Sequence, residues 1–410
     1  MGEKDSDINP DIHTAVDRGE STGLMEPLLM SEGSRHRPAL TEFALELASQ
    51  SAAFSASLPQ GVLKALADLV RAMNCYYSNL IEGHDTHPID IERALKNDYS
   101  ADPRKRDLQL EARAYIAVQK WIDEKGLKAR PTASASIIEI HKRFCENLPQ
   151  DLLVVEDSQR GERVRVVPGE LRRRDVRVGR HVPVSPGAVP RFLRRFEEGY
   201  GMLGRAETVL ATAAAHHRLL WIHPFVDGNG RVARLVTHAM LLECLETGAV
   251  WSVARGLARR EAEYKQHLAQ CDLPRRNDLD GRGTLSEEAL AEFARFFLEV
   301  CTDQVAFMRD LVEPNKLRGR ILQWVEGEVG SGSLPAKAGS VLEAMLYRGE
   351  LARADVANVL GTTDRHARRI TSALLDSDVL RSDGPRGALS LNFPARLASS
   401  WMPGLFPDKL

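Results

Sequence analysis

The chain has 410 residues, and its 55 Lys and Arg are balanced by 57 Asp and Glu, which gives a formal net charge of −2. This balance argues against general binding of nucleic acid through a basic surface. No apolar run reaches the roughly 18 residues that a membrane-spanning helix needs, and the acidic, polar N-terminal region lacks the apolar core of a signal peptide. Because the five cysteines show no paired spacing, reduced thiols and a cytoplasmic location are expected.

Helices are expected through the N-terminal third of the chain. They follow a tail, residues 1–35, whose Gly, Ser, Asp and Glu content predicts disorder. Apolar residues recur at helical spacing from about 39 to 82, and again from 108 to 122 and from 137 to 148. We therefore assign residues 36–160 to an N-terminal helical region, which includes a helix at about 70–83.

The end of that helix carries a hydroxyl and a carboxylate on one face. Ser78 and Glu82 are four residues apart, and Gly83 is suited to end the helix. A carboxylate at this end opposes the helix dipole, which makes Glu82 an unusual choice. Taken alone, Glu82 is most simply explained as a solvent-facing side chain.

A short β-hairpin is expected within residues 168–185. Alternating side chains followed by Gly179 predict a strand and a turn, and an exposed strand edge can bind an extended peptide by main-chain hydrogen bonds. An ordinary surface hairpin is the alternative. The preceding arginine run, 172–174, is expected to be solvated, where it would attract an acidic target. The strand residues are Asp175, Val176, Arg177 and Val178.

The run from His223 to Arg234, HPFVDGNGRVAR, has the composition of a phosphate-binding turn. Pro224 disfavours helical geometry at His223, while Gly228 and Gly230 allow a tight turn and a close approach to a ligand. Apolar residues at helical spacing after the turn predict that it opens a helix. The unpaired N–H groups at a helix N-terminus form an anion site.

The side chains of this run suit a nucleoside triphosphate. Arg231 and Arg234 are three residues apart, so their planar guanidinium groups can reach different phosphates. Asp227 can hold Mg²⁺, and His223 can accept a proton from an attacking hydroxyl. Each residue alone has an ordinary explanation: a loop histidine, a turn aspartate or a solvated arginine pair. Their joint occurrence favours the functional interpretation.

The run resembles the signature of the Fic family, H-P-F-x-[DE]-G-N-G-R-x-x-R, and matches it at every fixed position. Most members are protein adenylyltransferases, which transfer AMP from ATP to a protein hydroxyl and release pyrophosphate. The resemblance implies a mainly α fold, with a Fic-type helical core at 161–312 and a small β-hairpin flap at 168–185 that positions the target hydroxyl. It also implies His223 as the general base, Asp227 as the Mg²⁺ ligand, Asn229 with the Gly228 and Gly230 backbone as the α-phosphate cradle, Arg231 and Arg234 as ligands of the distal phosphates, and Phe225 as a buried anchor.

Two further segments resemble parts of Fic proteins. Residues 78–83 resemble the [ST]-x-x-x-E-[GN] inhibitory helix, in the subclass whose inhibitory helix precedes the catalytic motif. The resemblance implies that Glu82 pairs with Arg234 and blocks the seat of the γ-phosphate, as an Arg–carboxylate pair would. In some relatives the same Glu assists removal of AMP. Tyr264 is placed against the adenine ring, although the family shows paired tyrosines where this chain has Glu263-Tyr264.

The C-terminal part of the chain has the pattern of a separate domain. A connecting helix and a Gly- and Ser-rich linker are expected at 313–335, followed at 336–410 by a winged helix-turn-helix-like order of elements. Arg365, Arg368 and Arg369 fall on the helix that would face DNA. The ten Lys and Arg and eight Asp and Glu of 336–410 give a net charge of 10 − 8 = +2, so a target-docking or packing module is favoured over DNA binding.

Two classes of function follow. The first is an autoinhibited adenylyltransferase, spanning about residues 39–312, that uses ATP and Mg²⁺ and acts on a hydroxyl-bearing target protein. The second is a DNA- or partner-binding regulator that works through 336–410 and has a degenerate core. The motif favours the enzyme, because a degenerate core should have lost His223, Asp227 or an arginine. The sequence leaves open de-AMPylation, transfer of another nucleotide or phosphate group, self-modification and a homodimer.

Overall fold

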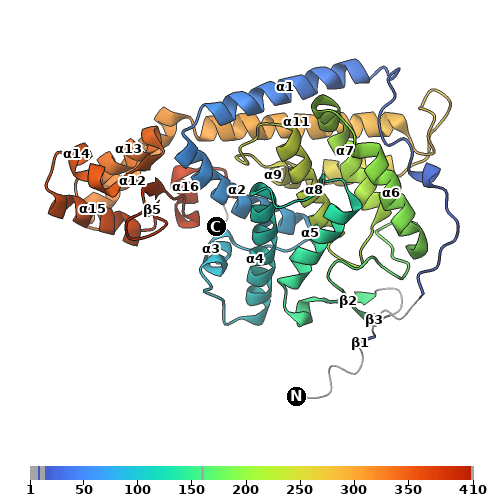
Figure 1. Cartoon of the computed structure of the whole chain (residues 1–410), viewed down its shortest axis with the longest axis horizontal. Helices are drawn as coiled ribbons and strands as arrows, with labels where there is room; N and C mark the ends of the chain where they lie inside the picture. The colour runs from blue at the N-terminus through green and yellow to red at the C-terminus, as the bar shows by residue number, and fades with distance from the viewer. Residues whose placement is uncertain (1–7, 10–13, 158–160, 408–410) are drawn as a thin grey trace.

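The computed structural model describes residues 8–9, 14–157 and 161–407. Most of residues 1–13 of the predicted tail therefore lie outside the described residues. The described chain is mainly helical, as predicted (Figure 1). None of its described helices is long and apolar enough to cross a membrane.

Two helices, α7 (Arg205–Ile222) and α8 (Asn229–Cys244), form the centre of the larger body and pack against each other. Nearly every side chain of α7 from Thr208 onward is buried, because the helix is rich in Ala and apolar residues on all sides. The loop 223–228 joins the two helices. The other helices of this body are α1 (Arg37–Ala56), α2 (Gln60–Ile81), α3 (Pro88–Leu95), α4 (Pro103–Asp123), α5 (Ser134–Glu146), α6 (Val189–Tyr200), α9 (Val253–Arg259), α10 (Glu261–Cys271) and α11 (Glu287–Leu311).

The surrounding helices place the 223–228 loop between several elements. α2, α4 and α5 pack against α8, α6 packs against α7, and the long helices α1 and α11 lie side by side along one edge (Figure 1). Side chains from α2, α4 and α5 therefore reach the loop and the first turns of α8. All five cysteines are buried and unpaired, in agreement with the expected reduced state.

Residues 14–35 differ from the disordered tail that composition predicts. They run along the body, where Met25 and Leu28 are buried. The Tyr200 hydroxyl donates a hydrogen bond to the Leu28 carbonyl oxygen at 2.8 Å. The buried apolar side chains offset the conformational entropy that the segment loses when it is ordered.

Side-chain alternation predicts a β-hairpin within residues 168–185, but the antiparallel hairpin of the larger body lies earlier in the chain. β2 (Val154–Asp157) pairs with β3 (Glu162–Arg165), and β1 (Ile8–Asn9) adds to β3 in parallel. Within the described residues of 168–185, strand pairing is limited to one bridge between Val178 and His181, around a turn at Gly179. The strand predicted over 175–178 is therefore present only as a single bridge. Hydrogen bonds to side chains, and not to a second strand, hold this segment.

The C-terminal part begins with α12 (Pro314–Gly330), which runs through residues predicted as linker. Buried Leu317, Ile321 and Val325 hold α12 against its neighbours, so the helix continues through its glycines. The elements that follow are α13 (Ala338–Arg348), β4 (Glu350–Leu351), α14 (Val356–Leu360), α15 (Asp364–Asp376), β5 (Leu380–Arg381), β6 (Leu389–Leu391) and α16 (Ala398–Trp401). The strands form an antiparallel sheet in the order β4-β6-β5. We call residues 338–407 the C-terminal module.

Candidate functional site

His223 ends α7 in a left-handed backbone conformation, with φ 51° and ψ 64°. This region is uncommon for a residue other than glycine, so surrounding contacts must hold it. The backbone N–H of Arg172 donates to the Pro224 carbonyl oxygen at 2.9 Å, and Arg172 Nε donates to the His223 carbonyl oxygen at 2.7 Å. These bonds satisfy carbonyl groups at the end of α7 and fix the start of the loop.

Arg172 corrects the prediction of a solvated arginine run. Its side chain is buried, with Nη1 donating to the Arg174 carbonyl oxygen at 3.1 Å and Nη2 to the Val184 carbonyl oxygen at 2.5 Å. Burial lowers the pKa of Arg172 to about 10, which still leaves it charged at pH 7. Arg174 is also buried, whereas Arg173 is half-exposed and pairs with Glu170. The run is therefore mainly structural, because Arg172 connects the 168–185 segment to the 223–228 loop.

Burial, assisted by the Arg172 guanidinium, lowers the pKa of His223 to about 4. The imidazole is therefore neutral at pH 7, which is the form that can accept a proton. The residue is only partly covered by protein, so a reacting group can approach it. These properties suit the general base that the sequence predicts.

Phe225 anchors the loop, as predicted. Its ring is fully buried and stacks on His141 of α5, with ring centroids 3.8 Å apart and planes 3° from parallel. His141 Nδ1 accepts a hydrogen bond from the backbone N–H of Gly169 at 2.9 Å. His141 thus connects the 168–185 segment to the loop, a role for which the sequence offers no signal beyond a buried helix position.

Asn229 closes the loop on itself. Its Oδ1 accepts from the Phe225 N–H at 3.0 Å, and its Nδ2 donates to the Phe225 carbonyl oxygen at 2.9 Å. The amide side chain is thus used within the loop. The first hydrogen bond of α8 runs from Val232 N to the Gly228 carbonyl oxygen, so the N–H groups of residues 229–231 point out of the helix end. Those backbone groups form the anion site of this turn.

Arg234 is buried and bound by the end of α2. Its Nε donates to Ser78 Oγ at 2.8 Å, and its Nη2 donates to the Ser78 carbonyl oxygen at 3.2 Å and to Glu82 Oε1 at 2.5 Å. α2 ends at Ile81, and Gly83 follows with φ +85°, as the sequence predicts. Ser78 and Glu82 thus both bind Arg234, and Gly83 follows them at the end of the helix.

The carboxylate of Glu82 lies directly over the first turn of α8. A Cβ atom added to Gly230 would be 2.1 Å from Glu82 Oε1, so only glycine permits this approach. Burial by itself raises the pKa of Glu82, but the Arg234 guanidinium holds that pKa below its usual value. Glu82 is therefore an anion at neutral pH, and its carboxylate lies against Gly230 in the first turn of α8.

Arg231 is paired with a residue that the sequence reasoning missed. Its Nη2 lies 2.6 Å from Glu111 Oε1 of α4, and both side chains are about nine-tenths buried. Glu111 Oε2 lies 3.0 Å from His84 Nδ1, and this hydrogen bond raises the pKa of His84. The available signal was a Glu on the buried face of α4, beside Ala112 and one turn before Tyr115.

Asp227 stands at the mouth of the site, with its side chain half-exposed and Oδ2 3.9 Å from Arg231 Nη1. The described residues contain no group of three or more His, Cys, Asp or Glu that could hold a metal ion by themselves. One accessible carboxylate beside a phosphate site fits Mg²⁺, which takes most of its remaining ligands from water and phosphates.

Tyr264 is buried, so its ring is not open to an adenine base in this structure. Its hydroxyl lies 2.7 Å from Nε2 of His216, whose Nδ1 lies 2.8 Å from Thr237 Oγ1. Because burial lowers the pKa of His216 to about 3, the ring is neutral. His216 is thus a core residue, and Tyr264 has a structural contact that competes with the predicted role.

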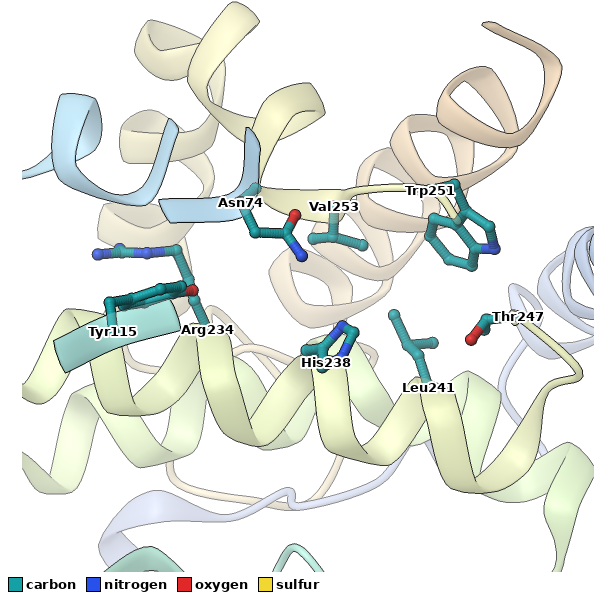
Figure 2. A pocket seen from close by; sticks show the side chains of 9 residues that line it. Asn74, Tyr115, Arg234, His238, Leu241, Thr247, Trp251 and Val253 are labelled. Atoms are coloured by element: carbon teal, nitrogen blue, oxygen red, sulfur yellow. The ribbon is translucent and has the colours of Figure 1, made fainter. Parts of the chain in front are cut away.

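A narrow cavity lies on one side of Arg234 (Figure 2). Arg234 and Tyr115 lie at one end and Thr247 and Trp251 at the other. Asn74 Oδ1, on the α2 side, is buried without a hydrogen-bond partner among the described residues. The side chain of Arg234 therefore borders this cavity as well as the end of α2.

The 168–185 segment is held by the N-terminal segment 14–35 and by α7. Arg18 Nη1 donates to Asp175 Oδ1 at 3.0 Å, and His181 Nε2 lies 2.8 Å from the Trp221 carbonyl oxygen. Val178 and Val182 are exposed. The segment thus presents exposed apolar side chains near the end of α7.

Residues 131–241, which include the 168–185 segment and the whole His223–Arg234 run, match the protein-family model described as "Fic/DOC family". This segment of the chain is similar to the Fic/DOC family. Residues 78–83 lie outside this match.

Distant relatives of the Fic domain are protein adenylyltransferases. "Protein adenylyltransferase Fic" of Drosophila virilis is 30% identical over 169 residues, which are 41% of this chain and 32% of that protein. The Drosophila erecta protein of the same name is 28% identical over 169 residues, 41% of this chain and 31% of its own length. The match thus spans about a third of the length of these relatives.

The fold extends beyond the matched segment. A crystal structure of a Fic family protein from Desulfovibrio desulfuricans G20 aligns with a TM-score of 0.51 at 16% identity, over 89% of this chain and 98% of that chain. At this identity the likeness shows the fold alone. The protein therefore has a mainly helical, Fic-like fold.

Proposed function

We propose that the Fic domain transfers AMP from ATP to a Ser, Thr or Tyr hydroxyl of a protein, and that Glu82 holds it in an inhibited resting state. The observation that carries this proposal is the set of groups around the N-terminus of α8. A neutral His223, the accessible carboxylate of Asp227 and two arginines surround three outward-pointing backbone N–H groups. These are the groups needed to bind a triphosphate and to deprotonate a hydroxyl beside it.

The proposed reaction uses these groups in order. His223 takes the proton of the target hydroxyl, whose oxygen attacks the α-phosphorus. The bond between the α-phosphorus and the oxygen bridging to the β-phosphate breaks, and pyrophosphate leaves. The N–H groups of 229–231 bind phosphate oxygens, and Arg231 and Arg234 stabilise the charge on the leaving pyrophosphate. When bound by Asp227, Mg²⁺ would neutralise phosphate charge.

The inhibited state is supported by the position of the Glu82 carboxylate. It neutralises Arg234, places a negative charge where a phosphate would bind, and lies against Gly230. A phosphate entering this site would lose one cationic ligand and meet like charge. Because the carboxylate is covalently part of α2, it competes at high effective concentration.

The 174–178 backbone is the proposed binding edge for the target. Main-chain groups outside helices and strands next to the end of α7 can pair with an extended peptide, and the exposed side chain of Val178 offers an apolar contact. This segment is fixed to the loop through Arg172, so a peptide bound there would be held at a constant distance from His223.

Transfer from labelled ATP tests the proposed function. A Glu82→Gly chain with Mg²⁺ and ATP labelled at the α-phosphate should label itself or an added protein mixture, while the parent chain labels weakly. Addition of His223→Ala should abolish the label. ATP labelled at the γ-phosphate should give none, which separates AMP transfer from phosphate transfer.

Labelled CTP, GTP and UTP extend the test to other nucleotides. A Glu82→Gly chain that retains its fold and transfers label from no nucleotide would refute the proposed activity. Prelabelled protein incubated with the parent chain tests for removal of AMP, the reverse activity.

DNA binding through the C-terminal module is the second candidate. Arg365, Arg368 and Arg369 are exposed on α15, where a recognition helix would present them. Retention of duplex DNA by the full chain, weakening steeply with salt and lost on Arg368→Ala, would support it.

A further inference from the structure

The C-terminal module contacts the inhibitory helix α2 along most of its length. At the start of α2, a Cβ added to Gly61 would lie 2.2 Å from the Gly349 carbonyl oxygen, so the two backbones touch. In the middle, Asp68 forms an ion pair with Arg381 of β5. In Figure 1, the module lies at the end of the molecule where α2 begins.

The last described residues of the chain bind α2 next to its inhibitory end. The Tyr77 hydroxyl donates to the Leu405 carbonyl oxygen at 2.9 Å, and Tyr76 packs edge-on against Phe406 with ring centroids 5.6 Å apart. Leu405 and Phe406 are buried. These contacts lie directly before Ser78, whose hydroxyl and carbonyl oxygens bind Arg234.

Arg255 of α9 holds the same terminal segment from the other side. Its Nη2 donates to the Gly404 carbonyl oxygen at 2.7 Å, and its Nε donates to the Leu405 carbonyl oxygen at 3.4 Å. The segment is therefore fixed between α9 and α2.

A chain of charged side chains connects the same interface with α8. Asp68 pairs with Arg71 as well as with Arg381, and Arg71 Nη1 donates to Asp123 Oδ2 at 2.8 Å. Asp123 Oδ1 lies 2.6 Å from Nε2 of His238, which stands one turn after Arg234 on α8. His238 also lines the cavity beside Arg234 (Figure 2). The contacts of the module thus reach both sides of the Glu82–Arg234 pair.

α2 can transmit a displacement to Glu82. Between Val62 and Ile81 it contains neither glycine nor proline, and most of its side chains are buried. Packed helices move as rigid elements, because their interiors do not deform continuously. A shift of residues 68–77 should therefore move Ser78 and Glu82 with them.

We propose that the C-terminal module clamps α2 in the inhibitory position, so that loosening this interface releases Arg234 from Glu82. This inference rests on the proposed inhibition by Glu82. The clamp consists of Arg381, acting on Asp68, and the 404–406 segment, acting on Tyr76 and Tyr77.

Tyr77→Phe and Arg381→Ala test the clamp in the full-length chain. Tyr77→Phe removes one hydrogen bond and keeps the ring, while Arg381→Ala leaves Asp68 paired with Arg71. The readout is the affinity for Mg²⁺ with a non-hydrolysable ATP analogue. Each variant should bind roughly fivefold more tightly than the parent, the shift that follows from losing one intramolecular hydrogen bond. Arg369→Ala, which removes an exposed arginine of α15 on the same module, is the matched control and should bind like the parent.

The same substitutions in a Glu82→Gly background separate the clamp from the proposed function. In that background, Tyr77→Phe and Arg381→Ala should change the affinity no further, because no carboxylate is left to release. Amide hydrogen exchange of residues 76–84 should be faster in both single variants and unchanged in Arg369→Ala.

The outcomes are distinguishable. If Glu82→Gly tightens binding while both clamp variants bind and exchange like the parent, the clamp is refuted and the inhibition stands. If the clamp variants tighten binding equally in both backgrounds, they act independently of Glu82, which also refutes it. If Glu82→Gly binds no better than the parent, the proposed inhibition fails and the clamp fails with it.

Discussion

Glu82 Oε1 lies 2.5 Å from Arg234 Nη2 and would lie 2.1 Å from a Cβ atom on Gly230. The ion pair and the glycine are thus two parts of one contact. Gly230 is in the first turn of a helix, where alanine is otherwise preferred because glycine loses more backbone entropy. The glycine is therefore explained by the carboxylate above it, and by the close approach of phosphate that the same space would allow.

The effect of Gly230→Ala on the free energy of unfolding should depend on the residue at position 82. It should change sign when Glu82 is replaced by glycine. In the parent chain the added methyl group meets the Glu82 carboxylate, and we expect a loss of about 1–3 kcal/mol in the free energy of unfolding. In a Glu82→Gly chain the same substitution should be neutral or stabilise by up to about 1 kcal/mol. Denaturant unfolding of the four chains measures both values.

Gly319→Ala is the matched control for this cycle. Gly319 is an exposed glycine within α12, where an added Cβ meets no atom within 4 Å. It should stabilise both backgrounds equally. Equal destabilisation by Gly230→Ala in both backgrounds would show that Glu82 does not occupy the space over the helix end.

Local spacing made much of the candidate site predictable. The end of α7 at His223, the helix after Gly228 and the buried Phe225 all follow from residues within one twelve-residue run, whereas the left-handed conformation of His223 does not. The position of Ser78 and Glu82 on one helix face follows from their spacing of four. Their contact with Arg234 joins elements more than 150 residues apart, and only the family resemblance indicated it.

Other features depend on contacts that no local pattern encodes. Three consecutive arginines are expected to be solvated. Arg172 is nevertheless buried, because its guanidinium donates hydrogen bonds to carbonyl oxygens at the end of α7 and to that of Val184. The 14–35 segment looks disordered by composition, yet a few apolar side chains hold it on the body. Glu111 gave only a weak signal, because its partner Arg231 lies on another helix.

Glu111→Gln tests whether Glu111 positions Arg231 for phosphate. Glu111 Oε1 holds Arg231 Nη2 at 2.6 Å, so this ion pair fixes the position of the guanidinium beside the start of α8. In a Glu82→Gly background, the amide keeps the hydrogen-bond acceptor and loses the charge, so affinity for ATP should fall about threefold to tenfold. Affinity for AMP should change less, because AMP lacks the distal phosphates.

Glu124→Gln, on an exposed residue at the end of the same helix, controls for a general effect on α4. Calorimetric titration with ATP and AMP gives the comparison. A tenfold loss for both nucleotides would indicate damage to the fold and not to Arg231. Tighter ATP binding would show that Glu111 competes with phosphate for Arg231.

Asp227→Asn should remove the dependence of nucleotide binding on Mg²⁺. Asp227 is the accessible carboxylate beside the proposed phosphate site, and neutral Asn is a poor ligand for a hard divalent cation. In the Glu82→Gly background, we expect EDTA to weaken ATP binding at least about tenfold, and Asp227→Asn to reduce that difference to about twofold or less. A metal effect that survives the substitution would place the cation on other residues.

His223 should titrate near pH 4 in the nucleotide-free protein. Its pKa in the fold lies below the value of about 6.5 for an unperturbed histidine. Between these values the unfolded chain binds more protons, so the contribution of His223 to stability is lost as the pH falls through this window. The ring ¹³C resonance, assigned with His223→Ala, reports the midpoint. A midpoint above pH 6 would contradict the buried, neutral imidazole.

Arg172→Lys should weaken both the fold and transfer, although it keeps the charge. Lysine cannot reproduce the planar donors that bind the carbonyl oxygens of His223, Arg174 and Val184. Leaving such groups unsatisfied in a buried site costs about 1–3 kcal/mol each, and His223 loses the bond that holds its backbone. We expect a loss of about 3 kcal/mol or more in the free energy of unfolding and at least about a tenfold loss of transfer in the Glu82→Gly background.

Arg173→Lys supplies the comparison for Arg172→Lys, since Arg173 is half-exposed and pairs with Glu170 on the surface. It should stay within about 0.5 kcal/mol of the parent and transfer AMP at the same rate. Denaturant unfolding and label incorporation, both at pH 7, measure the two effects. Equal behaviour of the two lysine variants would mean that the buried guanidinium does not hold His223 in its left-handed conformation.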